Sequence, residues 1–123
     1  MKKKLVSTIL AATAVGSMLV TSVSAEEAKT YNIGICQLVQ HVALDAATEG
    51  FKDALTDKFG DAVTFDEQNA QGDSNTCSTI INGFVSNGVD LILANATPAL
   101  QAAQAGTADI PILGTSVTEY GVA

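Results

Sequence analysis

Small polar side chains follow each of the four apolar segments that the sequence predicts to be strands. They are mostly neutral hydrogen-bond donors and acceptors: Gln40, His41 and Asp45 after the first segment, Asn69, Gln71 and Asp73 after the second, Asn95 and Thr97 after the third, and Thr115, Ser116, Thr118 and Glu119 after the fourth. In an open parallel sheet, ligands bind in the crevice outside the carboxyl ends of the strands. Such groups suit a polar ligand held by directed hydrogen bonds at a helix N-terminus, where free N–H groups favour an anion.

The sequence does not supply the partner residues that a catalytic role for these side chains would need. His41 is the single histidine, and with Asp45 it would give a general base and an orienting carboxylate, but no nucleophile with an elbow motif accompanies them. A ligand or hinge role, or a solvated loop, is therefore favoured over catalysis for His41. The scattered acids and the unpaired spacing of the two cysteines do not indicate a metal site. Glycine-rich phosphate motifs are absent as well, so neither an enzyme nor a cofactor is expected.

The elements that must position these side chains alternate regularly along the chain. Apolar segments at 31–39, 62–67, 90–94 and 110–114 predict strands, and amphipathic segments at 45–59, 74–87 and 98–105 predict helices. This alternation predicts an α/β fold with a doubly wound parallel sheet, in which four strands alternate with three helices. We expect Ile33 and Ile35 to face one side of the sheet and Cys36 the other, and the second helix to bury Phe84 and Val85.

The first 25 residues have the pattern of a secretory signal peptide, with cleavage expected after Ala25. Lys2, Lys3 and Lys4 precede an apolar stretch that is too short and too interrupted to favour a retained membrane anchor. The product is thus expected in the periplasm or outside the cell. Residues 26–123 would then form one lobe, which we expect to be incomplete because the chain stops soon after a strand, where an α/β sheet normally continues.

The charge of residues 26–123 argues against one class of partner, and their two cysteines raise the question of a disulfide. After residue 25 the chain keeps three lysines and no arginine against thirteen acidic residues, so a nucleic acid would find no basic surface to bind. Cys36 and Cys77 can pair in an exported protein, because that compartment is oxidising. The favoured alternative is that both are small buried apolar residues, since pairing needs close and correctly aimed Cβ atoms.

Four segments carry a resemblance to a known family. They are 33–41 with 43–45 and 49–51, then 68–73, then 89–92 with 96–99, and last 110–112 with 116–118. In this order they resemble the ABC-transporter substrate-binding family related to tryptophan and tyrosine uptake proteins. The resemblance implies a type I periplasmic-binding fold of two similar lobes, of which this chain is the first. It also implies a small polar solute, an amino acid and often an aromatic one, that is delivered to a membrane permease.

The resemblance also assigns the ligand-binding positions. By motif these are Gln37, His41, Leu44, Asp45, Asn69, Gln71, Gly72, Ala96, Thr97, Pro98, Ser116, Val117 and Thr118. Two alternatives stay open beside this reading. One is a sugar-type or autoinducer-type binding protein of the same fold. The other is a small exported flavodoxin-like enzyme or a receiver-like module, against which the signal peptide and the missing phosphate loop both weigh.

Overall fold

The computed structural model describes residues 28–118 and Gly121, and the predicted signal peptide lies outside this part. The described elements are β1 (Tyr31–Gln37), α2 (Val42–Phe59), a short 3-10 turn η1 (Gly60–Ala62), β2 (Val63–Asn69), α3 (Ser74–Asn87), β3 (Leu91–Asn95), α4 (Thr97–Gly106) and β4 (Ile112–Thr115). The four strands form one parallel sheet in the order β2-β1-β3-β4. Within the described residues, no helix combines the length and apolar character needed to cross a bilayer.

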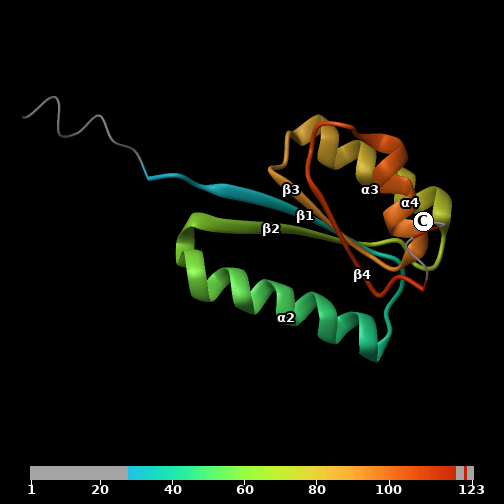
Figure 1. Ribbon diagram of the computed structural model, residues 1–123, viewed down its shortest axis with the longest axis horizontal. Helices are drawn as coiled ribbons and strands as arrows, with labels where there is room; N and C mark the ends of the chain where they lie inside the picture. The colour runs from blue at the N-terminus through green and yellow to red at the C-terminus, as the bar shows by residue number, and fades with distance from the viewer. Residues whose placement is uncertain (1–27, 119–120, 122–123) are drawn as a thin grey trace, which may run out of the picture.

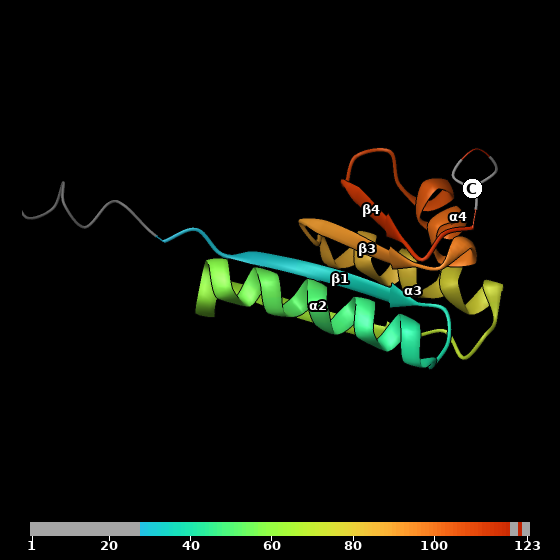
Figure 2. The same cartoon turned by 60° about the horizontal axis from the view of Figure 1, so that its bottom comes forward.

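The chain winds outward from β1 in both directions. It runs from β1 through α2 to β2, then crosses back through α3 to β3 on the other side of β1, and continues through α4 to β4. Helix α2 covers one face of the sheet, and α3 and α4 cover the opposite face (Figures 1 and 2). The doubly wound parallel sheet predicted from the alternation is therefore confirmed. The reversal of winding places a topological switch point between β1 and β3.

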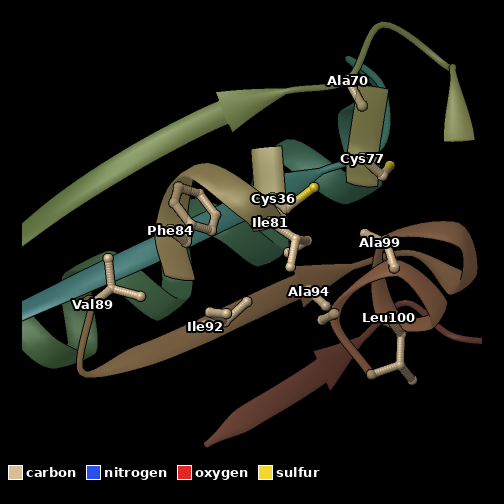
Figure 3. Close-up of a cluster of buried hydrophobic side chains, with 12 residues drawn as sticks. Cys36, Ala70, Cys77, Ile81, Phe84, Val89, Ile92, Ala94, Ala99 and Leu100 are labelled. Carbon is tan, nitrogen blue, oxygen red and sulfur yellow. The ribbon is translucent and has the colours of Figure 1, made fainter. Parts of the chain in front are cut away.

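Alternation along β1 divides the core into two layers. Ile33 and Ile35 pack on the α2 side with Phe51 and Phe65, whose two rings meet edge to face. Cys36 faces the other layer, where it lies with Cys77, Ile81 and Phe84 of α3 and with the apolar side of α4 (Figure 3). This is the division of faces that the sequence predicts.

A close approach between β1 and α3 sets the depth of the second layer. The ring of Phe84 lies over Gly34, and a Cβ added at Gly34 would come within 2.7 Å of that ring. Phe84 is only 1% exposed and is the largest fully buried side chain of the described residues. Glycine in a strand often marks such a contact, because the missing side chain lets a neighbour approach the backbone.

Some predicted boundaries are wrong by a few residues. Strand β1 ends at Gln37 rather than at residue 39, and Val39 is half exposed. Helix α2 begins at Val42 rather than at residue 45, because Nδ1 of His41 accepts a hydrogen bond from the N–H of Ala43 and so caps the helix. Val85, predicted to be buried, is 37% exposed, since it lies beside the buried stripe of α3.

The two cysteines lie in the same layer, as expected. Both are buried free thiols on neighbouring elements, Cys36 on β1 and Cys77 on α3 (Figure 3). Burial, with a smaller contribution from Cys77, raises the pKa of Cys36 to about 12. A thiol with so high a pKa is a poor nucleophile, so both residues act here as small apolar groups. Their pairing in the exported protein stays the less favoured of the two alternatives that the sequence left open.

Candidate functional site

The switch point brings two amide side chains together at the carboxyl end of the sheet. Gln37 is the last residue of β1 and Asn95 the last of β3, and the two are register partners. Their side chains are 4% and 0% exposed. Because ligands of doubly wound sheets bind where the winding reverses, these amides mark the floor of the candidate site.

A polar hollow of about 370 Å³ opens beside Gln37. It is lined by side chains that offer hydrogen bonds and negative charge, namely Gln37, Gln40, Asp45, Glu67, Gln68 and Asn69. Asp45 lies in the first turn of α2, where the helix dipole favours a carboxylate. Nε2 of Gln37 donates a 2.7 Å hydrogen bond to Oδ1 of Asp45. This side of the site is thus an acceptor surface.

Of the two carboxylates that line the hollow, Glu67 forms an ion pair with a lysine and Asp45 does not. Nζ of Lys52 lies 2.8 Å from Glu67 and 3.2 Å from Glu49, and these hydrogen bonds raise the pKa of Lys52. Lys52 makes both salt bridges found among the described residues, and Asp45 takes part in neither. Asp45 therefore presents a negative charge that can attract a cationic group of a ligand.

A larger hollow of about 420 Å³ lies at the opposite end of the sheet. Its walls are mostly apolar and include Tyr31, Leu55, Phe59 and Leu91. It opens at the amino ends of the strands, away from the switch point and from the polar groups of the loops. We therefore place the candidate site at the smaller, polar hollow.

The second half of the site is the N-terminus of α4. The side chains of His41 and Asp73 cap α2 and α3, whereas Ala96, which occupies the N-cap position of α4, offers no side-chain hydrogen bond. Pro98 lies in the first turn, as predicted. The N–H groups of the first turn of α4, to which Pro98 contributes none, therefore have no side-chain cap, and such groups at a helix N-terminus favour an anion.

A hydrogen bond joins α4 to the loop after β4. The N–H of Thr118 donates to Oγ1 of Thr97 at 3.3 Å, which holds residues 116–118 against the first turn of the helix. Val117 turns its side chain toward the core on the α3 and α4 side of the sheet. The two segments that the sequence assigns separately to the site, residues 96–98 and 116–118, are thus one structural unit.

Backbone strain is concentrated at this end of the sheet. Within residues 28–118, three residues other than glycine have positive φ, and they follow three successive strands: Gln71 at 56°, Ala96 at 93° and Ser116 at 58°. Ala96, with ψ of 157°, occupies a region that is nearly restricted to glycine. Strain of this kind gathers at ligand-binding sites, where the surrounding structure imposes it.

The strain at Ala96 leads to a prediction about stability. Replacing Ala96 with glycine is expected to stabilise the folded protein by about 1 kcal/mol, because relief of the strained φ exceeds the added entropy of the unfolded chain. Ala54→Gly, at an exposed position inside α2, should instead destabilise by about 1 kcal/mol. Urea denaturation of the complete polypeptide measures both changes. A loss of stability in Ala96→Gly as large as in Ala54→Gly would contradict the strained backbone.

Known proteins resemble this chain in sequence and in fold. The model of the family described as "ABC transporter substrate binding protein" matches residues 32–122. The chain belongs to this family. A tyrosine-binding protein of Clostridioides difficile (strain R20291) is 45% identical to this chain over 95% of this chain's length, and the match covers 38% of that relative.

Two solved structures share the fold of this chain. The ligand-free, open structure of a substrate binding protein with adhesive properties from Clostridium difficile is 45% identical, with a TM-score of 0.72 over 76% of this chain. An ABC domain in complex with L-Trp from Streptococcus pneumonia is 33% identical, with a TM-score of 0.70 over 74% of this chain. The matches cover 32% of each of these longer chains.

The structure brings some of the predicted site residues together. Gln37, Asp45 and Asn69 line the polar hollow. Gln71 and Gly72 lie in the adjoining loop, which is held by hydrogen bonds from Gln71 N to Asn69 Oδ1 and from Gly72 N to Leu38 O. These two loop residues are not among those that line the hollow.

Other predicted residues have structural duties that the sequence does not reveal. His41 is exposed and uses Nδ1 to cap α2, and Leu44 offers its backbone carbonyl to the amide of Asn95 at 2.8 Å. Glu67, Gln68 and Thr48 belong to the site or its support without having been assigned to it, whereas Gln40 was expected at this end of the sheet but was not among the ligand-binding positions. For Thr48 a signal was present, because it is a polar residue on the core-facing side of α2.

Proposed function

We propose that this chain is the first lobe of an exported solute-binding protein that serves an ABC importer and captures an amino acid, often an aromatic one. A second lobe would close over the crevice, and a membrane permease would receive the solute. The observation that carries the proposal is that the carboxyl end of the sheet holds both the carboxylate of Asp45, which makes no ion pair with the described residues, and the N-terminus of α4, which has no side-chain cap.

These two groups complement the two charges of a zwitterion. The α-ammonium of an amino acid would lie against Asp45, and its α-carboxylate would accept hydrogen bonds from the first turn of α4 and from Thr97. The tyrosine-binding protein and the complex with L-Trp among the relatives support this class of solute. The family membership supports binding and transport rather than catalysis, and the signal-peptide pattern supports action outside the cytoplasm.

A thermal-shift screen of the complete polypeptide against the amino acids and common sugars tests the proposal. Stabilisation by L-tyrosine or L-tryptophan is expected, since a ligand that binds only the folded state raises its stability. The amide side chains of the hollow could also bind sugar hydroxyl groups. Stabilisation by sugars alone would therefore replace the amino-acid proposal with the sugar-type alternative.

The contact between Thr97 and Thr118 gives a further prediction. Thr97→Val keeps the shape of the side chain but removes the hydroxyl that accepts from Thr118 and that would bind the solute. Loss of a charge-assisted hydrogen bond of about 1.5 to 3 kcal/mol should weaken binding roughly ten- to a hundredfold. Thr79→Val, at an exposed position on α3, serves as the matched control in calorimetry. Affinity within about twofold of the wild type would remove Thr97 from the pocket, because a tenfold change is about 1.4 kcal/mol.

A further inference from the structure

Four buried or half-buried side chains form a continuous chain of hydrogen bonds beneath the polar hollow. Nδ2 of Asn95 donates to Oγ1 of Thr48 at 3.0 Å, and Oγ1 of Thr48 donates to Oε1 of Gln37 at 2.7 Å. Nε2 of Gln37 then donates to Oδ1 of Asp45 at 2.7 Å and to the carbonyl of Val39 at 2.9 Å. The chain therefore begins at β3, passes through α2 and β1, and ends on the carboxylate of the site.

The buried end of this hydrogen-bond chain, at Asn95, fixes which group donates and which accepts along it. Nδ2 of Asn95 also donates to the carbonyl of Leu44, and a reversed amide would place two oxygens against each other there. Oδ1 of Asn95 remains without a partner as a result, the one such buried side-chain atom among the described residues. The orientation of Asn95 is thus maintained although it leaves an acceptor unsatisfied.

Thr48 transmits this direction because its hydroxyl both accepts and donates. A threonine inside a helix commonly donates to the carbonyl four residues earlier, which for Thr48 is that of Leu44. Here Asn95 donates to that carbonyl instead, and the Thr48 hydroxyl donates to Gln37. Thr48 is only 1% exposed. The amide of Gln37 must then present its oxygen to Thr48 and its N–H groups to Asp45.

We propose that Thr48 is a positioning residue of the solute site, which fixes the amide of Gln37 and through it the carboxylate of Asp45. The inference rests on the proposed function, since Asp45 is there the group that receives the ammonium of the solute. Thr48 itself lies beneath the hollow and is not among its lining residues. It acts on affinity by keeping Asp45 in one orientation before the solute arrives, which lowers the entropy lost on binding.

The test compares two solutes that differ only in the group Asp45 would bind. Calorimetry of the complete polypeptide uses L-tyrosine and its desamino analogue, which lacks the ammonium. In Thr48→Val, affinity for tyrosine should fall about tenfold, in the range of a hydrogen bond to a charged group, with the analogue changed less than about twofold. Thr48→Ser keeps the hydroxyl and should restore binding. Thr56→Val, exposed on the same helix, is the matched control.

Outcomes of this comparison separate the inference from the proposed function. Equal weakening of both solutes in Thr48→Val, or failure of Thr48→Ser to restore tyrosine binding, would show a general effect on folding and overturn the positioning role. If the wild type binds neither these solutes nor any other amino acid of the thermal-shift screen, the proposed function fails. The positioning role is then decided by 15N relaxation of the Gln37 side-chain amide in the ligand-free protein.

That second measurement needs no solute. The Gln37 amide should be rigid in the wild type and in Thr48→Ser, and mobile in Thr48→Val. An amide that stays equally rigid without the hydroxyl would contradict the inference. Should Thr48→Val fail to fold, Thr48→Ala removes the hydroxyl without placing a second methyl group beside Gln37, and the same outcomes apply to it.

Discussion

Asp45→Asn is expected to weaken amino-acid binding by about ten- to a hundredfold, as large a change in affinity as the one expected for Thr97→Val. The substitution removes the negative charge that would pair with the ammonium of the solute. It keeps an oxygen that can still accept from Nε2 of Gln37, so the support of the site remains. Calorimetric titration of the complete polypeptide with L-tyrosine or L-tryptophan measures the change.

The matched control for this substitution lies on the same helix. Asp53 is exposed on α2 and does not line the polar hollow, so Asp53→Asn removes the same charge from the protein without touching the site. Its affinity should stay within about twofold of the wild type, because exposed charges at a distance are screened by salt. Equal effects of the two substitutions would attribute the loss to net charge and would contradict the role of Asp45.

Phe84→Ala should produce the largest loss of stability. Removal of this ring opens a cavity between α3 and Gly34 that the central strand cannot fill, since β1 is paired on both sides. Substitutions of this type cost about 3 to 5 kcal/mol. The neighbouring Val85 is 37% exposed, so Val85→Ala should cost less than about 1 kcal/mol. Urea denaturation of the two variants checks both values, and similar losses would contradict the packing of α3 against β1.

The sequence predicted the elements well because their patterns are local. Alternation in β1 and the helical spacing in α3 depend on residues a few positions apart, and the division of Ile33 and Cys36 between two layers followed from it. The errors occur where tertiary contacts decide. Helix α2 starts earlier than predicted because His41 caps it, and Val85 is exposed because it lies beside the stripe of α3 that Cys77, Ile81 and Phe84 bury.

The candidate site was predictable in part. Residues that follow strands can be found from the strands themselves, which placed Asp45 and Asn69 in the hollow. The neutralisation of Glu67 by Lys52 joins α2 to β2 and has no local signature. Ala96 likewise gives no sign of its positive φ, because alanine is ordinary in the sequence and only the crossing from β3 to α4 imposes the strain.

The most direct test of the account is a crystal structure of the complete polypeptide with a bound amino acid. The account predicts that the ammonium lies within hydrogen-bond distance of the Asp45 carboxylate, and that the carboxylate of the solute accepts from the N–H groups of the first turn of α4 beside Thr97. A solute bound in the apolar hollow at the amino ends of the strands, or one in the crevice that contacts neither Asp45 nor α4, would contradict it.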